Sequence, residues 1–468
     1  MDGTVNQMLR AIPSVDSLLQ DASIKPVVDR YGRGPVARMV RLATDDLRAQ
    51  IRSGRALPAD VRQWLVQSVI KMVDATFRPH YCKAVNATGI ILHTGLGRAV
   101  LPEAALEQVQ QTLRGYSVLQ VDRLTGTRSR RDGRIEWLLQ QLTGCQAATV
   151  VNNNAAATAI VLNTVAKGKE VIVSRGQLVE IGGSFRLPEV MAFSGARLLE
   201  VGTTNRTHIY DYQRAINENT AVILRVHPSN YRIRGFTSEV PLEELVELAH
   251  KHNLIMVDDL GAGALIDLAQ FGLEHEPLIS DSIKAGADIV TCSCDKLIGG
   301  PQAGLIIGRK DLIDTVRKNQ FARIVRVDKL TLAALEATLL LHLDQDIALR
   351  QIPTYQILRK DIGQLRSVAD RIADALAQKG LAASITIAAG SSQMGSGSLP
   401  TQELPTILVA IRPQEIGPDE LAMRMRMCQP PVFTRIERDQ VVIDTRTLLD
   451  GEEGLVIGAV CEALSYKG

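Results

Sequence analysis

Short apolar runs alternate with amphipathic stretches between residues 146 and 308. Turn or helical residues flank each of these apolar runs, which are AATVV, VIVS, ARLLEV, AVILRV, LIMVD, ADIVT and GLIIG. Strands that are apolar on both faces and alternate with helices are typical of a sheet buried between two helical layers. The intervening PLEELVELAHKHN has apolar residues at helical spacing after an acidic first turn. This pattern predicts an α/β domain with a mainly parallel sheet.

The pattern changes after this region. DKLTLAALEATLLLHL and LRKDIGQLRSVADRIADALAQKG predict long helices, and ITIAAG, TILVAI, PVFTRI and QVVIDT predict strands of a small α+β domain. Helices are expected near 417–427 and 452–465. The Gly- and Ser-rich GSSQMGSGS predicts a mobile loop between two of the strands.

The N-terminal stretch predicts a separate helical module. Ser14, within IPSVDSLLQ, is placed to cap a helix that carries an apolar stripe. The predicted organisation is a helical module at 1–70, a large α/β domain at 71–345 and a small domain at 346–468.

Composition narrows the class of protein. With 468 residues, 46% of them hydrophobic, the chain can bury a sizeable core. Its formal charge of +2 is too small to attract a polyanion through the net charge of the whole protein, so any such partner must bind a local basic patch. The six cysteines form no CxxC pair, which favours a reducing, cytoplasmic compartment. No signal peptide or membrane-length apolar run is evident. The pair Cys292 and Cys294 is too closely spaced for a zinc site and no HExxH motif occurs, so no metal is expected.

A lysine placed at the end of a buried strand is the first candidate for chemistry. ADIVTCSCDKLIGGPQAGLIIG predicts a strand, a turn carrying Lys296, a Gly-Gly-Pro break and another strand. Partial desolvation there would lower the pKa of Lys296 and free its amine to attack a carbonyl. A salt-bridged structural lysine fits the same spacing. The small residue Ser293 would let a flat ring approach the backbone.

An aspartate at a strand end supplies the second requirement of pyridoxal phosphate (PLP) chemistry. LIMVDDLGAG places Asp258 and Asp259 at the carboxyl edge of the sheet, where open α/β sheets bind ligands. A carboxylate beside the ring nitrogen keeps it protonated, and the protonated ring is the electron sink. Side chains alternate along a strand, so only one of the two faces the cofactor. Lys296 would hold this cofactor as a Schiff base.

A strand-to-helix turn offers the third requirement, a phosphate site. In TVVNNNAAATAIVLN a strand ends at Val151 and an alanine-rich helix follows. The backbone N–H groups of Asn153, Asn154 and Ala155 would point at the phosphate. Asparagine runs are also common as inert turns.

Arginines gather in three places. Arg98 follows the Gly-x-Gly turn of LHTGLGRAVL, and Arg323 and Arg326 precede Lys329 in QFARIVRVDKL. The guanidinium groups of these arginines are suited to binding phosphate-like oxyanions. Neither a dinucleotide fingerprint nor a GxxxxGK[ST] loop occurs, which argues against nicotinamide and nucleotide-hydrolysing functions. A third group of arginines shares one face of a predicted helix and consists of Arg38, Arg41, Arg48 and Arg52. This face is either a solvated surface with ion pairs or a phosphate-binding surface.

Nine ordered blocks carry a resemblance to a known family. IPSVDSLL, LHTGLGRA, VVNNNAAA, LVEIGGSFRLPEVM, EVGTTNRTHIYDY, SNYRIRGFTSEV, DLGAGAL, DKLIGGPQAG and RVDKLTL run through nearly the whole chain. Together they resemble bacterial selenocysteine synthase, the L-seryl-tRNA(Sec) selenium transferase family. This resemblance implies a fold-type I PLP-dependent transferase, aspartate-aminotransferase-like, in the α/β class.

The resemblance also implies roles for individual residues. Lys296 carries PLP, Asp259 rather than Asp258 lies under the ring, and Asp295 takes part in catalysis. The selenium donor, selenophosphate, is implied to bind Arg98, Arg323 and Arg326. The implied reaction is the conversion of L-seryl-tRNA(Sec) to L-selenocysteinyl-tRNA(Sec) by loss of water and addition of selenium. The resemblance also implies that the enzyme is a homodecamer. The arginine face of the N-terminal module is then the predicted tRNA-binding surface.

The chain departs from the family pattern at four places, and rival functions remain. Gly95, Gln177, Cys294 and the stretch at 124–136 differ from the pattern, which affects substrate details rather than the PLP core. A related PLP lyase or ammonia-lyase acting on a small amino sugar or amino acid should lack the N-terminal module. An ordinary aminotransferase would need an arginine to bind a free substrate carboxylate, whereas an esterified aminoacyl end has no free carboxylate. A non-catalytic tRNA-binding protein has no reason to keep lysine, aspartate and phosphate turn together. No DNA or membrane partner is expected.

Overall fold

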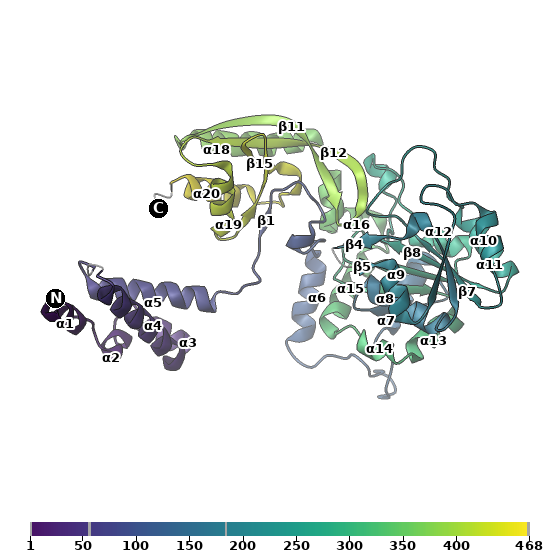
Figure 1. Ribbon diagram of the computed structural model, residues 1–468, viewed down its shortest axis with the longest axis horizontal. Helices are drawn as coiled ribbons and strands as arrows, with labels where there is room; N and C mark the ends of the chain where they lie inside the picture. Colours follow the sequence, from purple (N-terminus) through teal and green to yellow (C-terminus); the bar gives the residue numbers. More distant parts are fainter. Residues whose placement is uncertain (1, 55–57, 183–184, 466–468) are drawn as a thin grey trace. The chain divides into compact units, whose positions relative to one another are not determined.

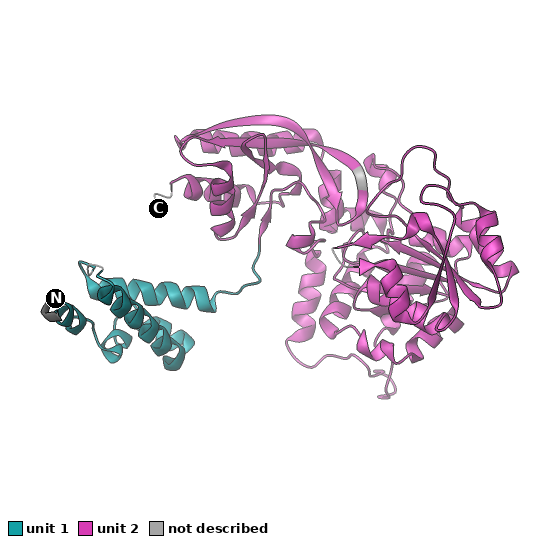
Figure 2. Cartoon of the chain, in the orientation of Figure 1, with its two compact units in different colours: residues 1–83 teal, residues 84–468 magenta. Residues whose placement is uncertain are grey.

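Residues 1–83 and residues 84–468 form separate units of the chain (Figure 2). The computed structural model describes residues 2–54, 58–182 and 185–465, so Gly183 and Ser184, which belong to one motif quoted above, lie outside the described residues. A boundary at residue 70 would cut helix α5 (Val61–Phe77), and the N-terminal unit therefore extends past the predicted boundary to Lys83. The predicted division at residue 345 stays a prediction.

The N-terminal unit is a small helical bundle. Its other helices are α1 (Asp2–Arg10), α2 (Val15–Leu19), α3 (Lys25–Tyr31) and α4 (Arg33–Arg52) (Figure 1). Ser14 caps α2 as predicted, because its side chain accepts a hydrogen bond from the Ser17 N–H at 3.2 Å. Fully buried Leu18, Val40 and Leu65 come from three different helices, so the unit has its own apolar core.

The large sheet of the second unit has seven strands that match the seven apolar runs. In spatial order they are β2 (Ala147–Val151), β10 (Gly304–Gly308), β9 (Ile289–Ser293), β8 (Ile255–Gly261), β7 (Thr220–Val226), β3 (Glu170–Ser174) and β6 (Arg197–Val201). Only β10 runs antiparallel to its neighbours, so the sheet is mainly parallel, as predicted.

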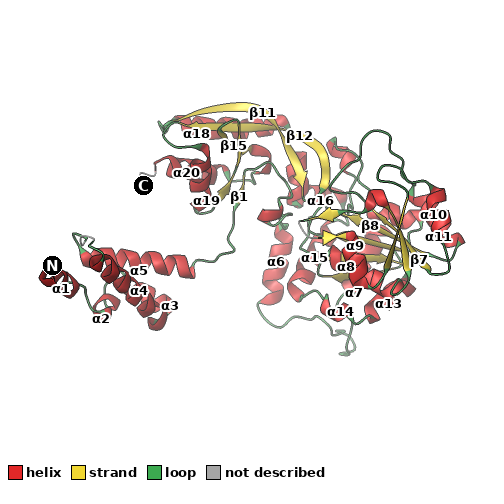
Figure 3. Ribbon diagram, in the orientation of Figure 1, coloured by secondary structure: helices red, strands yellow, loops and turns green. Residues whose placement is uncertain are grey.

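Helices cover both faces of this sheet (Figure 3). One face packs against α8 (Asn154–Val165), α9 (Leu187–Ser194) and α13 (Lys310–Lys318). The other packs against α7 (Gly133–Thr143), α11 (Leu242–Lys251), α12 (Ile279–Ala285) and α15 (Lys329–Leu341). Neighbouring side chains of a strand pack on opposite faces of the sheet: Val151 packs on the face covered by α8, and Val150 packs on the face covered by α7. This two-sided burial explains why the strands lack polar alternation.

A second sheet of four strands lies in the C-terminal part of the same unit. Its order is β11 (Ala383–Gly395), β12 (Ser398–Pro413), β15 (Gln440–Asp444) and β14 (Arg435–Glu437), and its core is shared with α18 (Ile362–Ala377), α19 (Pro418–Met427) and α20 (Glu453–Ser465). The prediction of a mobile loop over GSSQMGSGS is wrong. Residues 390–395 continue β11 and pair with β12, leaving only a two-residue turn at Ser396 and Gly397.

No helix among the described residues has both the length and the apolar character needed to cross a bilayer.

Candidate active site

Helix α8 begins directly after strand β2, as the phosphate turn requires. The Asn153 side chain caps the helix by accepting a hydrogen bond from the Ala156 N–H at 2.9 Å, which leaves the N–H groups of Asn154 and Ala155 in the first turn. Strand β10 passes so close that a Cβ on Gly304 would lie 2.2 Å from the Asn153 carbonyl oxygen. The predicted phosphate residues thus lie together at the carboxyl edge of the sheet.

The two aspartates that end β8 have separate environments. Asp258 is fully buried, pairs with Arg225 at 3.1 Å and accepts a hydrogen bond from Ser282 Oγ at 2.6 Å. Asp259 points to the opposite face of the strand, toward α8. The ion pair occupies Asp258, so Asp259 is the carboxylate available to a ligand.

Asp259 is held in one orientation by three donors. The Asn154 side-chain amide and the Thr158 hydroxyl each donate to it at 2.8 Å, and the Gly261 N–H donates at 3.0 Å. Burial, the largest influence, raises the pKa of Asp259 despite these hydrogen bonds. A positively charged partner would stabilise the carboxylate. Asn154 links this acid to the phosphate turn, and its side-chain oxygen is buried without a hydrogen-bond partner.

Lys296 lies in the turn between β9 and β10 with 5% of its surface exposed. Burial, followed by the nearby charge of Arg98, lowers the pKa of Lys296, while Asp295, Asp259 and Glu276 oppose the shift. The net direction favours the neutral amine, the nucleophilic form. Ser293, also predicted to contact the cofactor, ends β9 and is buried.

Two side chains that the sequence did not single out hold the backbone after Lys296. The Tyr355 hydroxyl donates to the Leu297 carbonyl oxygen at 2.7 Å, and His342 Nε2 donates to the Ile298 carbonyl oxygen at 2.9 Å. Burial lowers the pKa of His342 to about 4, so its ring is neutral at physiological pH. Both residues come from the helical segment that follows the large sheet, and no local sequence signal connects them to the lysine.

Arg98 meets Asp295 beside the lysine. Arg98 Nη1 donates to the Asp295 carboxylate at 2.5 Å, and Arg98 Nε is buried without a partner. The backbone of Arg98 has a φ of 63°, in the left-handed region that non-glycine residues rarely adopt. Such strain is concentrated at functional sites. The structure therefore brings the predicted residue Arg98 beside the turn that carries the two others, Asp295 and Lys296.

Arg323 and Arg326 lie at the end of β2 rather than in contact with Lys296. Arg323 belongs to α14 (Phe321–Ile324), and Arg326 forms a β-bridge with Val151 immediately before the phosphate turn. Both side chains are exposed. Burial and the charges of Arg326 and Arg323 are among the causes that lower the pKa of Arg131, which shows how closely like charges gather here. Such a gathering of guanidinium groups suits an oxyanion.

Two departures from the family pattern have a simple structural reading. The buried Gln177 side-chain oxygen accepts the Val226 N–H at 3.1 Å, which an amide can do as well as a carboxylate. Cys294 is fully buried, and burial raises the pKa of its thiol. The thiol therefore stays protonated and inert.

The four predicted tRNA-binding arginines lie on the exposed face of α4. At 100° per residue they span about 80° of arc, opposite the buried Val36, Val40 and Leu47. Arg48 forms an ion pair with Asp45 at 2.8 Å. Within the described part of the chain, Arg38, Arg41 and Arg52 form no ion pair.

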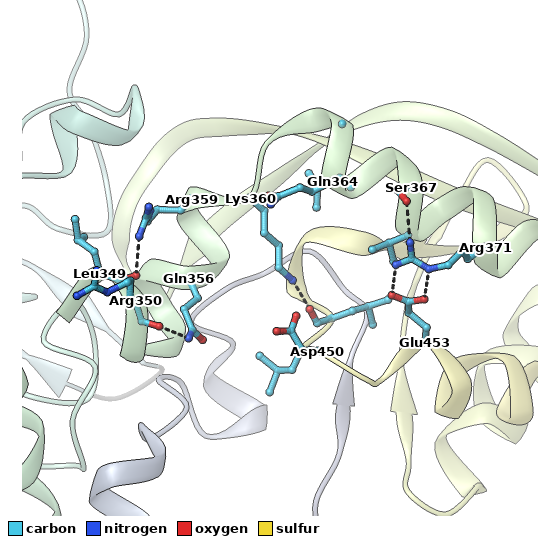
Figure 4. Close-up of a pocket in the computed structure, with 15 residues that line it drawn as sticks. Leu349, Arg350, Gln356, Arg359, Lys360, Gln364, Ser367, Arg371, Asp450 and Glu453 are labelled. Carbon is cyan, nitrogen blue, oxygen red and sulfur yellow. Dashed lines mark hydrogen bonds and ion pairs between the residues drawn. The ribbon is translucent and has the colours of Figure 1, made fainter. Parts of the chain in front are cut away.

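A cavity of 730 Å³ lies elsewhere, between α18, the helices α16 (Gln345–Gln351) and α17 (Pro353–Arg359), and the segment that leads into α20 (Figure 4). Its main charged groups are satisfied within the protein: Arg371 donates to both carboxylate oxygens of Glu453, and Lys360 Nζ donates to two backbone carbonyl oxygens. None of the predicted site residues lines it. This cavity is therefore separate from the Lys296 site.

Comparison with known proteins adds to this geometry. A family model described as L-seryl-tRNA selenium transferase matches residues 84–449, and one described as selenocysteine synthase N terminal matches residues 9–48. The chain is 45% identical over 468 residues to the L-seryl-tRNA(Sec) selenium transferase of Nitratidesulfovibrio vulgaris, covering 98% of this chain and 100% of that protein. It is 42% identical over 458 residues to that of Alkaliphilus metalliredigens, covering 97% and 98%.

Similarity to a solved structure supports the fold class. D-Glucosaminate-6-phosphate ammonia-lyase superimposes with a TM-score of 0.57 at 19% identity, over 82% of this chain and 96% of that chain. The predicted fold class, a fold-type I arrangement with a mainly parallel sheet, is confirmed.

Proposed function

This chain belongs to the L-seryl-tRNA selenium transferase family, and from that premise we propose that it converts L-seryl-tRNA(Sec) to L-selenocysteinyl-tRNA(Sec). It is a PLP-dependent transferase. The single observation that carries the proposal is the family match over both units of the chain, residues 9–48 and 84–449. The match to the N-terminal unit also disfavours a PLP lyase that acts on a small free amine.

The residues around Lys296 fit PLP. A buried lysine with a lowered pKa, a carboxylate oriented at a strand end and a helix N-terminus lie along one edge of the sheet. Asn154 offers a buried acceptor without a partner, and glycine at 304 leaves the phosphate turn unobstructed. When bound, the cofactor supplies an electron sink for the bond broken at the serine α-carbon.

The chain's own residues then hold and move protons. The neutral amine of Lys296 accepts the proton from the serine Cα. Asp259, fixed by Asn154 and Thr158, would keep the ring nitrogen of the cofactor protonated. Arg98 keeps the Asp295 carboxylate beside the lysine. The N–H groups of Asn154 and Ala155 would hold the phosphate oxygens of the cofactor.

We expect Asp259→Asn to weaken PLP binding about 10- to 100-fold, since a charge-assisted contact contributes about 1.5–3 kcal/mol. Equilibrium titration with PLP, followed by visible absorbance, measures this. Asp258→Asn is the matched control on the same strand. Because Asp258 is paired with Arg225, its loss should reduce stability rather than change the absorbance of bound PLP. A larger loss of PLP affinity in Asp258→Asn would reverse the assignment.

Selenophosphate is the proposed selenium donor, bound by Arg98, Arg323 and Arg326. Arg323→Ala or Arg326→Ala should raise the donor KM about 10- to 100-fold through the loss of one charged hydrogen bond. Loss of water from seryl-tRNA should continue, so the dehydrated residue accumulates on tRNA. Arg366→Ala, which removes a surface ion pair on α18, is the control. Normal donor saturation in both site variants contradicts the assignment.

A homo-oligomer, a decamer by family resemblance, is part of the proposal. Support comes from exposed apolar side chains on one groove, where Phe193 is 74% exposed and Ile324 72% exposed. A cytoplasmic location is also proposed. All six cysteines are free thiols, which suits a reducing compartment.

A further inference from the structure

A histidine–carboxylate pair lies at the end of strand β7. His227 follows the last residue of that strand, and His227 Nε2 lies 3.0 Å from the Glu276 carboxylate. The backbone N–H of His227 donates to the backbone carbonyl oxygen of Asp259 at 2.9 Å, so His227 lies at the strand end adjacent to that of Asp259. The His227 side chain is 20% exposed, whereas that of Glu276 is 6% exposed. The pair thus has a buried carboxylate and an imidazole that solvent can reach.

The surroundings connect this pair to the Lys296 site. Burial lowers the pKa of Lys296, and the negative charge of Glu276 is among the charges that oppose this shift, so the carboxylate is electrostatically coupled to the amine. Ser229, two residues beyond His227, has a buried hydroxyl without a hydrogen-bond partner. Gly261 has no side chain to fill the space beside that hydroxyl; a Cβ there would lie 3.3 Å from Ser229 Oγ. Polar groups without internal partners at a strand edge are typical of a ligand-binding site.

We propose that His227, oriented by Glu276, is the general acid that protonates the departing hydroxyl of the seryl residue. This inference rests on the proposed function. The Cα–H bond breaks and its proton passes to the Lys296 amine. The Cβ–O bond breaks with its electron pair going to oxygen, and the oxygen takes a proton from the His227 imidazolium to leave as water. The electron pair released from the Cα–H bond forms the Cα=Cβ double bond. Lys296 then loses its extra proton to solvent, and His227 regains one from it. Glu276 is a positioning residue that fixes the ring.

Other nearby groups are poorly suited to this step. Asp295 is bound to Arg98 as a carboxylate and so accepts rather than donates hydrogen bonds. Lys296 is engaged at the α-carbon. The thiols of Cys292 and Cys294 have no exposed surface, which keeps them from the substrate. His227 combines an exchangeable proton, solvent access and a fixed carboxylate partner.

The test separates the two proton transfers in the full-length protein loaded with PLP and seryl-tRNA. Exchange of the serine α-hydrogen in deuterium oxide reports the Lys296 step, and loss of water reports the His227 step. We expect His227→Gln to keep the cofactor absorbance and the exchange, and to slow water loss about 10²- to 10⁴-fold, the range for general acid catalysis. Glu276→Gln should lower kcat for water loss by a smaller factor with an unchanged KM, and Glu276→Asp should recover part of it.

His275→Gln is the matched control, because His275 adjoins Glu276 in sequence but contacts Asp267 on the surface. Normal water loss in His227→Gln overturns the inference. So does parallel loss of exchange, absorbance and water loss in both His227→Gln and Glu276→Gln, since that marks a structural role. If the unaltered chain neither exchanges nor loses water, the proposed function fails as well. Failure of the inference alone leaves the unaltered chain active.

Discussion

Lys296→Ala is expected to abolish the visible absorbance of bound PLP and to reduce the reaction with seryl-tRNA by at least about 10³-fold. The substitution removes both the amine that binds the cofactor covalently and the base at the α-carbon. The fold should survive, because removing a buried amine with a lowered pKa also removes a desolvation cost. Absorbance spectra and borohydride reduction followed by mass analysis measure the covalent adduct directly.

Lys360→Ala provides the control for this experiment. Lys360 also has a pKa lowered chiefly by burial, but its amine donates to backbone carbonyl oxygens beside the separate cavity. Its replacement should reduce stability and leave the absorbance of bound PLP intact. A borohydride-fixed adduct that persists in Lys296→Ala would show that another amine holds the cofactor.

The sequence predicted the large sheet well because both faces of each strand are buried. Continuous apolar runs locate such strands, and the strand-end rule then places Lys296, Asp259 and the phosphate turn at one edge. The choice between Asp258 and Asp259 remained open on alternation alone. Arg225 and Thr158, far away in sequence, distinguish the two aspartates through their contacts.

Other features depended on contacts that a sequence does not encode locally. The glycines and serines at 390–395 suggest a loop, yet their backbone groups pair with β12 and Ser392 donates to the buried Asp444 at 2.9 Å. Long-range pairing overrides local composition there. Tyr355 and His342 hold the lysine turn from helices, and the pairing of His227 with Glu276 joins two loops. No periodicity marks these contacts.

The N-terminal unit gives the second large expected effect, on tRNA binding. Removal of residues 1–83 should leave a protein that still binds PLP, because every predicted cofactor residue and its packing lie in residues 84–468. Seryl-tRNA binding should weaken by orders of magnitude, since charged contacts to phosphates dominate such affinity. Cutting at 83 rather than 70 avoids leaving half of α5 without its bundle.

Substitution of single arginines tests the proposed tRNA surface within the intact chain. Arg38→Ala, Arg41→Ala and Arg52→Ala should each lower affinity and reduce the salt dependence of binding by about one phosphate contact. Asp45→Asn is a control of opposite sign, because it removes the carboxylate that pairs with Arg48 and should strengthen binding and steepen the salt dependence. Titrations with tRNA at several salt concentrations give both quantities. Equal affinity and slope in the truncated and full-length proteins would place tRNA recognition in residues 84–468 and leave the α4 arginines as a solvated surface.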